Sequence, residues 1–328
     1  MAHSAESTFG IVAIGRNEGD RLKRCLRSLP AGAPIVYVDS GSSDGSDQWA
    51  RGFGAEVVQL DLSTPFTAAR ARNAGFRRLS QLNRDLLWVQ FVDGDCELAS
   101  EWPDTAISFL QGNAKVAAVF GRRRERAPDR SVYNRLCDWE WDGPAGDSRA
   151  CGGDVMIRST AFQEVGGYRD LLIAGEEPEL CVRLRAAGWR IVRLDAEMTW
   201  HDAAMTRFSQ WWKRTLRSGY AFAEGAYLHG APPERHWVWE SRRAWIWGVF
   251  LPILCVAAGI ALMPWGWVSF AIYPLQMIRQ SSRGPGDFRE RATKAFFQVI
   301  GRFPEALGQL QFWRDRLFSR KSLLIEYK

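Results

Sequence analysis

Several familiar signatures are missing from this chain of 328 residues. It contains neither GxGxxG nor GxxxxGK[ST], which argues against a dinucleotide-dependent oxidoreductase and against a P-loop enzyme. Its six cysteines form no CxxC pair and show no metal-ligand spacing with the four histidines, so we expect free thiols in a reducing compartment. The start, MAHSAESTFG, has no basic segment followed by an apolar one, so no signal peptide is predicted. We therefore expect the first half of the chain to stay in the cytosol.

Positive charge is scarce early in the chain and concentrated late. From residue 203 onward there are about 18 Lys and Arg against about 8 Asp and Glu, whereas the upstream part is slightly acidic. The same late region holds more than half of the 16 tryptophans. Basic residues and tryptophan around long apolar runs are typical of a membrane interface. Single-strand nucleic-acid grooves use similar residues but need no long charge-free stretch. We therefore expect a membrane surface as partner and no nucleic acid.

The first 93 residues alternate short apolar runs with amphipathic segments. The hydrophobic spacing predicts strands at 9–15, 35–38, 55–60 and 86–93, and helices at 18–29, 47–53 and 66–79. Strands of nearly continuous Val, Ile and Leu between helices are typical of a parallel sheet covered by helices. Ligands bind such sheets beyond the carboxyl ends of the strands.

Carboxylates stand at the ends of two of these predicted strands. Asp39 ends the second strand, and Asp93 and Asp95 of FVDGDCE follow the fourth. Asp-Gly-Asp alone most often makes a turn that ends a strand. At a rim where a second strand also delivers a carboxylate, the pair suits a hard cation, Mg²⁺ or Mn²⁺, that keeps positions open for substrate phosphates. Cys96 beside them is expected to be a small buried residue.

Six motifs occur in order between residues 9 and 202: VAIGRNEGDRLKRCLRSL, VYVDSGSSDGS, ARNAGF, FVDGDCELAS, CGGDVMIRSTAFQEVGGYRD and GEEPELCVRLRAAGWRI. With them the chain resembles the family 2 glycosyltransferases, inverting enzymes of the GT-A fold, and especially their membrane-associated bacterial members. The resemblance implies an α/β fold with a Rossmann-like, mostly parallel sheet and helices on both faces, followed by C-terminal membrane-associated helices. It implies a nucleotide-sugar donor, UDP-sugar rather than GDP-sugar, and a Mg²⁺ or Mn²⁺ cofactor.

The resemblance also assigns the donor site. Four residues would line the nucleoside pocket, namely Arg16, Glu18, Arg72 and, at the nucleobase, Asp39. The alternatives to a nucleoside contact are that Arg72 is a solvated charge on a helix and that Glu18 is an acidic residue favoured at a helix start. Asp95 would bind the metal directly, and Asp93 would hold the ribose or the waters of the metal. The metal would neutralise the charge that builds on the departing nucleoside diphosphate.

The general base is expected in GEEPEL. The second acidic residue of this motif would take the proton of the acceptor hydroxyl during in-line displacement, and here it is Glu177 where the family usually has Asp. Glu reaches about 1 Å farther than Asp, so either the base is set back or Glu176 shares its role. A helix start would by itself explain both residues.

Further contacts are assigned to residues on either side of the base. Gly153 and Asp154 of CGGD would hold the acceptor, or the loop is a tight turn. His201 would contact the metal or the diphosphate, and a purely structural role is the alternative. In RFSQWWKRTLRSGYAF the pattern Gln-x-x-Arg-Trp of processive enzymes is incomplete. We therefore expect one sugar per encounter, with a diphosphate clamp drawn from Lys213, Arg214 or Arg217.

About 35 residues between Arg243 and Arg279 carry no charge. A break at 263–266 divides them into an arm at 244–263, long enough to span a membrane, and a shorter arm at 267–278. Basic residues at both outer ends favour a hairpin, spanning or re-entrant, with both ends cytosolic. A core hairpin of a soluble protein is the alternative. Residues 287–318 have the pattern of an interfacial amphipathic helix, bent at Pro304, or of a helix packed on the catalytic domain.

Three segments are expected: a GT-A catalytic domain at 1–205, linking helices near the active site at 206–240, and the membrane-associated hairpin and amphipathic helix at 241–328. The predicted function is transfer of a sugar to a lipid or lipid-linked saccharide at the cytosolic face of the inner membrane. A sugar nucleotidylyltransferase and a catalytically inactive membrane scaffold are the alternatives. The sugar, the acceptor, the linkage and the oligomeric state stay open.

Overall fold

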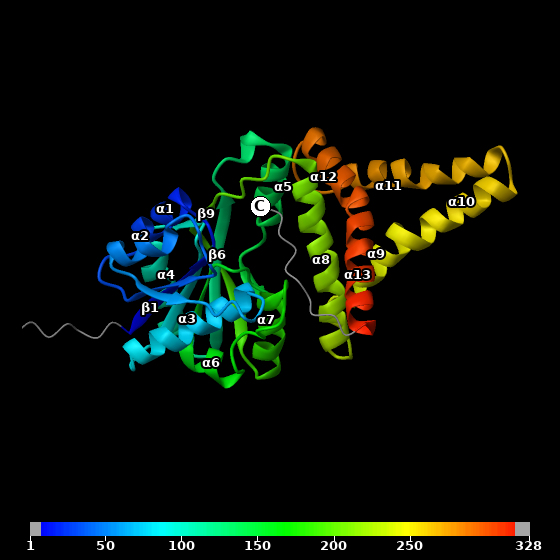
Figure 1. Cartoon of the computed structure of the whole chain (residues 1–328). Helices are drawn as coiled ribbons and strands as arrows, with labels where there is room; N and C mark the ends of the chain where they lie inside the picture. Colours follow the sequence, from blue (N-terminus) through cyan, green and yellow to red (C-terminus); the bar gives the residue numbers. More distant parts are fainter. Residues whose placement is uncertain (1–7, 319–328) are drawn as a thin grey trace, which may run out of the picture. The chain divides into compact units, whose positions relative to one another are not determined.

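The computed structural model describes residues 8–318, whose course Figure 1 traces from blue to red. These residues divide into two compact units, one ending at Thr206 and the other beginning at Arg207. The first unit holds all the described strands, and the second is helical.

A mixed sheet of nine strands forms the centre of the described part of the first unit. Hydrogen-bonded neighbours follow the order β3-β2-β1-β4-β8-β6-β9-β5, and β7 pairs with β9 outside this path. The strands are β1 (Phe9–Gly15), β2 (Ile35–Asp39), β3 (Glu56–Gln59), β4 (Trp88–Asp93), β5 (Cys96–Leu98), β6 (Val116–Glu125), β7 (Gly146–Ser148), β8 (Val155–Arg158) and β9 (Arg190–His201).

The half of the sheet built from β1 to β4 is parallel, as its nearly continuous apolar runs predict. In register, Gly15 lies opposite Asp39 and Ile14 lies opposite Asp93. The ends of these strands therefore deliver their loops to one rim. The predicted α/β sheet is confirmed, and each of the four predicted strands ends within two residues of its predicted bounds.

The other half of the sheet is mixed. β8 runs antiparallel to β4 and β6, and β9 is parallel to β6 but antiparallel to β5 and β7. The expected parallel arrangement therefore describes β1 to β4 and does not extend across the whole sheet.

Helices cover both faces of the sheet, as predicted. Ile11 and Ala13 of β1 belong to a core with α1, α2 and α4, whereas Val12 and Ile14 belong to a core with α3, α6 and α7. Successive residues of a strand point to opposite faces, which is why β1 serves both cores. The helices are α1 (Asp20–Ser28), α2 (Ser46–Phe53), α3 (Ala68–Leu82), α4 (Trp102–Gly112), α5 (Val132–Glu140), α6 (Ser159–Glu164) and α7 (Glu176–Ala186), with a 3₁₀ turn at Pro128–Arg130.

β6 and β9 are long neighbours whose register shifts between Phe120 and Arg122 and again between Arg122 and Arg123. A Cβ at Gly121 would lie 2.9 Å from the Cβ of Met198, so glycine lets the two strands approach here. Such bulges re-aim the side chains that follow them. The register of this pair therefore decides where Arg123 points.

The second unit is a bundle of helices. α8 and α13 form its most extensive contact, and two glycines make it possible, since a Cβ at Gly219 would collide with the Glu305 carbonyl and one at Gly308 with the Leu216 carbonyl. The helices are α8 (Phe208–His229), α9 (Val238–Trp245), α10 (Leu251–Ala261), α11 (Ile272–Ser281), α12 (Phe288–Ile300) and α13 (Arg302–Leu317), with a π turn at Ile246–Phe250 and a 3₁₀ segment at Trp265–Ala271.

The charge-free stretch forms two helical arms, as expected. Val238–Ala261 is the one helix among residues 8–318 that is long and apolar enough to cross a membrane. The return arm packs against it, because Gly259 lies against the Trp267 ring and Gly266 against the Ala258 carbonyl. The predicted domain boundary after residue 240 falls inside α9.

The amphipathic stretch differs from the prediction in one respect. Its helix breaks at Gly301, between α12 and α13, and not at Pro304. Pro304 lies in the first turn of α13, where the missing N–H has no helical partner to lose. One face of α13, with Ala306 and Phe312, is buried, while Leu307 and Leu310 are exposed.

Candidate active site

Two polar loops join at the rim after β1 and β2. The Asn17 side chain accepts the Ser43 N–H at 2.8 Å, and the Asn17 N–H donates to the Ser42 hydroxyl at 2.9 Å. The carboxylate of Asp39 is buried and accepts the N–H groups of Gly41 and Ser42 at 3.0 and 2.9 Å. Asp39 thus shapes the loop that follows β2, and its predicted nucleobase contact stays a prediction.

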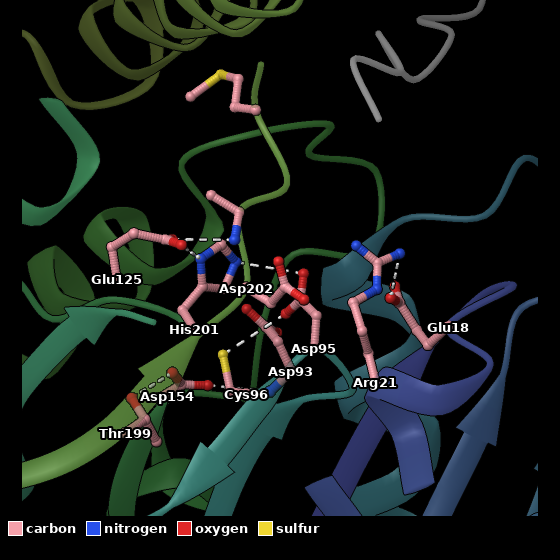
Figure 2. Close-up of polar contacts among 12 residues, drawn as sticks. Glu18, Arg21, Asp93, Asp95, Cys96, Glu125, Asp154, Thr199, His201 and Asp202 are labelled. Carbon is pink, nitrogen blue, oxygen red and sulfur yellow. Dashed lines mark hydrogen bonds and ion pairs between the residues drawn. The ribbon is translucent and has the colours of Figure 1, made fainter. Parts of the chain in front are cut away.

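Arg16 and Glu18 lie in the first of these loops, as predicted. The Arg16 guanidinium stands 4.6 Å from the centre of the Phe66 ring. Glu18 pairs with Arg21 at 2.8 Å, an ion pair drawn in Figure 2. The Cγ of Glu18 also lies 3.3 Å from where a Cβ on Gly94 would be, so Glu18 borders the Asp-Gly-Asp turn.

Arg72 of α3 is the centre of a buried acidic cluster. It is 2% exposed, and its Nη2 donates to Asp93 Oδ1 at 2.8 Å. Its Nη1 lies 3.0 Å from Glu176 Oε1 and 2.9 Å from Glu177 Oε1. Arg72 therefore holds three carboxylates together. The nucleoside contact that the sequence motif predicts for Arg72 stays a prediction.

Asp93 is held from several sides. Besides Arg72, Arg123 of β6 approaches its Oδ2 at 3.6 Å, and its N–H donates to Asp154 at 3.0 Å. Burial alone would raise the pKa of Asp93, but Arg72 and Arg123 outweigh it and lower that pKa to about 2. Asp93 is therefore a fixed negative charge near neutral pH.

Asp154 lies beneath Asp93 and is 1% exposed. Its second oxygen accepts the Thr199 hydroxyl at 2.8 Å, and Arg123 Nε lies 3.5 Å away. A carboxylate so enclosed holds the backbone of Asp93 in place, and the predicted acceptor contact of Asp154 stays a prediction. Neighbouring Gly153 has no room for a Cβ, which would collide with Arg72 and lie 2.9 Å from Asp93 Oδ2.

The two acidic residues of GEEPEL begin α7, after Gly175 in the left-handed region at φ 78°. The side chain of Glu176 is 5% exposed and that of Glu177 is 14% exposed, so Glu177 is the more accessible of the two. Burial and the carboxylate of Glu176 raise the pKa of Glu177 to about 7, against the attraction of Arg72. Glu177 can therefore exchange a proton near neutral pH.

Asp95 and His201 come together beside this cluster (Figure 2). His201 Nε2 lies 3.2 Å from Asp95 Oδ2, and His201 Nδ1 faces Glu125 Oε2 at 3.6 Å. Nδ1 is buried and makes no hydrogen bond. Burial, followed by the charge of Arg123, lowers the pKa of His201, so that its imidazole is neutral near pH 7.

These residues fit a divalent cation. His201 would hold the cation through Nε2 and keep its proton on Nδ1, which faces Glu125, as is typical of metal-ligating histidine. A carboxylate and an imidazole suit Mn²⁺, and the carboxylate suits Mg²⁺. A second cluster, Asp93 with Cys96 and Asp154, has ligand atoms within 4.8 Å of one another, but Arg123 already supplies it with a positive charge.

Four residues of the site were not predicted: Arg123, Glu125, Tyr168 and Thr199. Arg123 had a visible signal, since it is the middle residue of the basic run GRRRER. Tyr168 lies under Arg72, with its ring centre 5.6 Å from the guanidinium carbon. Lys213, Arg214 and Arg217 are on α8 in the second unit, so their diphosphate contact stays a prediction.

Comparison with known proteins places this geometry in context. The family model described as Glycosyl transferase family 2 matches residues 11–162. Glycosyltransferase AglE of Haloferax volcanii is 22% identical over 217 residues, which cover 62% of this chain and 69% of AglE. A pre-mycofactocin glycosyltransferase of Mycobacterium tuberculosis is 24% identical over 231 residues, covering 67% of this chain and 47% of the relative. The chain thus spans about half the length of the latter.

Two solved structures share the fold. The mannosyltransferase PcManGT from Pyrobaculum calidifontis, solved with GDP-Man and Mn²⁺, superposes with a TM-score of 0.59 at 14% identity, covering 94% of this chain and 88% of that one. S. aureus TarS 1-349 gives a TM-score of 0.50 at 13% identity, with 92% and 91% covered. At these identities the structures establish the GT-A fold.

Proposed function

Since the chain belongs to glycosyltransferase family 2 through its residues 11–162, we propose that it is a membrane-attached, metal-dependent, inverting transferase. It moves one sugar per encounter from a nucleotide-sugar donor to a lipid or lipid-linked saccharide at the cytosolic face of the inner membrane. We expect UDP as the donor nucleotide. The two solved relatives, whose complexes hold GDP-Man and UDP-GlcNAc, leave both nucleotides as candidates.

The observation that carries this proposal is the pairing of Glu177 with Asp93 across Arg72. The guanidinium keeps Asp93 ionised, while burial and Glu176 hold the pKa of Glu177 at about 7. A base with a pKa near the working pH is the most effective proton acceptor. Glu177 would take the proton of the acceptor hydroxyl as its oxygen attacks the anomeric carbon. Glu176, more buried and held by Arg72, would position it.

The donor side would be built around Asp95 and His201. A divalent cation bound there would supply electrostatic stabilisation of the leaving diphosphate. Asp93 would contact the ribose or water molecules at this edge, and Asp154 and Thr199 would fix its backbone. Asp39, Arg16 and Glu18 would contact the nucleoside at the rim that they share.

The lipid acceptor is inferred from the second unit. The hairpin carries exposed apolar side chains on both arms, among them Ile253, Leu254, Ile260, Trp265 and Val268. Uncharged helical arms with basic residues at their outer ends fit a hairpin inserted in a membrane from the cytosolic side. A bound membrane would bring a lipid-linked acceptor to the enzyme.

A donor panel tests the reaction. The purified chain is mixed with extracted membrane lipids and a series of UDP- and GDP-sugars, with Mn²⁺, with Mg²⁺ or with a chelator, and released nucleotide is measured. We expect nucleoside diphosphate release that depends on both lipid and metal. Pyrophosphate release instead would identify a nucleotidylyltransferase, and turnover under complete chelation would remove the metal from the proposal.

A matched pair of variants tests the base. Glu177→Gln should lower kcat by at least about 100-fold, the contribution typical of general base catalysis, with donor binding retained. Glu101→Gln, at an exposed position of the same unit, is the control and should keep full activity. Unchanged turnover in Glu177→Gln, or a larger loss of turnover in Glu176→Gln than in Glu177→Gln, would shift the role of the base to Glu176.

A further inference from the structure

Cys96 has a neighbourhood that the proposed sugar transfer does not explain. It lies directly opposite His201 in the antiparallel pairing of β5 with β9, so both side chains point to the same face of the sheet. Its Sγ lies 3.5 Å from Asp95 Oδ1, and Figure 2 shows it beside Asp93 and Asp95. The side chains of Asp95, Cys96 and His201 are all buried.

These three residues carry the ligand types of a soft cation: one carboxylate, one thiol and one imidazole. Around tetrahedral Zn²⁺, bonds of about 2.0 Å to N and O and about 2.3 Å to S separate N from O by about 3.3 Å and S from O by about 3.5 Å. His201 Nε2 lies 3.2 Å from Asp95 Oδ2, and Cys96 Sγ lies 3.5 Å from Asp95 Oδ1. Each of the two is at a tetrahedral separation from one oxygen of the Asp95 carboxylate, although not from the same oxygen. One ligand atom from each residue lies within 4.8 Å of the other two.

The surroundings favour such a cation further. Glu125 faces the unpaired Nδ1 of His201, as the second-shell partner of a metal-bound imidazole does. Arg123 Nη2 donates to Cys96 Sγ at 3.4 Å, which stabilises the thiolate that a cation needs but also brings the positive charge that Arg123 supplies to Asp93 and Asp154. Cysteine binds a cation as its thiolate, so binding here would release the thiol proton to solvent.

We propose that Asp95, Cys96 and His201 form a binding site for soft divalent cations, Zn²⁺ or Cd²⁺, through which these ions inhibit the protein. Zn²⁺ binds nitrogen, oxygen and sulfur ligands more tightly than Mn²⁺ does, and a thiolate widens the difference. Three protein ligands leave tetrahedral Zn²⁺ a single open position. An octahedral cation held by Asp95 and His201 alone keeps several positions open for a diphosphate. A soft cation would therefore displace the hard one and block the donor side.

Metal binding alone tests this inference, which goes beyond the proposed sugar transfer and needs no donor or acceptor. Co²⁺ and Cd²⁺ bound to a thiolate give a charge-transfer absorption in the ultraviolet, and the apo protein is titrated with each ion. We expect one equivalent of this absorption in the native chain and its loss in Cys96→Ser. The double variant Cys151→Ser, Cys181→Ser is the matched control, because these two thiols lie only 3.5 Å apart and are the other candidate for a soft ion.

Competition between Zn²⁺ and Mn²⁺ gives the quantitative result. Cys96→Ser should lower the preference for Zn²⁺ over Mn²⁺ at least tenfold, and the double variant should leave it unchanged. Cys96→Ala serves as a second replacement if the serine variant does not fold, as judged by circular dichroism. A charge-transfer absorption that survives in both Cys96 variants, or that disappears in the double variant, would overturn the inference.

Discussion

Ionisation of Glu177 should destabilise the first unit, and replacement by glutamine should remove this effect. The pKa of Glu177 lies at about 7, above the ordinary 4.5, so over the intervening pH range the unfolded chain has lost a proton that the folded chain still holds. A carboxyl group whose pKa is raised by folding contributes stability at low pH and loses it as the pH rises through the folded value. The stabilising form is the neutral acid, which glutamine imitates.

The magnitude follows from the two pKa values. Between pH 5 and pH 8, a carboxyl group that shifts from 4.5 to about 7 changes the free energy of unfolding by about 2–3 kcal/mol. Glu177→Gln should therefore gain about 2–3 kcal/mol relative to the native chain on going from pH 5 to pH 8. Titrating groups that do not interact with Glu177 are common to both proteins and cancel in this comparison.

Hydrogen exchange of the buried amides of β1 and β4 measures this difference within the first unit. Comparing the variant with the native chain at the same pH cancels the intrinsic pH dependence of exchange. For amides that exchange through global opening, about 2–3 kcal/mol corresponds to a relative change of roughly 30- to 150-fold in exchange rate between the two pH values.

The activity provides an independent readout of the same group. In the native chain kcat/KM should rise with pH up to about 7 and then level off, because the base must be ionised. Equal exchange rates for the two proteins at both pH values would refute the raised pKa. A kcat/KM that falls as the pH rises toward 7 would refute the assignment of Glu177 as the base.

Substitutions at four further positions test contacts within each unit. Arg72→Met leaves Glu176 and Glu177 without their cation and Asp93 with Arg123 alone, and should cost about 3–5 kcal/mol of stability, with Arg72→Lys in between, as measured by thermal unfolding; equal melting temperatures would contradict the cluster. Glu125→Gln should weaken Mn²⁺ binding about 10–100-fold in calorimetry without donor, and unchanged affinity would remove Glu125 from the metal site. Gly308→Val should lower the melting temperature, because its Cβ collides with the Leu216 carbonyl, whereas Gly52→Ala, in a helix with open space around it, should raise stability by about 0.5–1 kcal/mol.

The parallel half of the sheet was predictable because its signal is local. Runs such as FGIVAIG are buried on both faces, and the polar loops after them mark the rim. Asp39, Asp93 and Asp95 could be assigned to that rim because each follows such a run. The break at 263–266 was equally local, since Pro and Gly punctuate helices.

The other half of the sheet depends on pairings between distant segments. β6 reads VAAVFGRRRE, and half of this strand gives no apolar signal. Arg123 reaches Asp93 and Asp154 because two register shifts against β9 re-aim it, and no spacing within the motif encodes those shifts. Cys96 was predicted to be a small buried residue, and it is buried. Its position opposite His201 comes from a pairing across 105 positions of the chain, which a single sequence does not display.

Arg72 contacts carboxylates whose pKa values are shifted in opposite directions. Asp93 faces two guanidinium groups, and its pKa falls to about 2, whereas Glu177 shares one guanidinium with Glu176, and its pKa rises to about 7. The pKa values of two carboxylates that contact the same arginine thereby differ widely. One carboxylate stays an anion, and the other can gain and lose a proton near neutral pH. Pairs of acids separated in this way are how one site supports both charge stabilisation and proton transfer. The different protonation of the two carboxylates therefore depends on how many cations each one faces. Glu at position 177, where the family usually has Asp, is compatible with this arrangement, because Glu177 still reaches Arg72 at 2.9 Å.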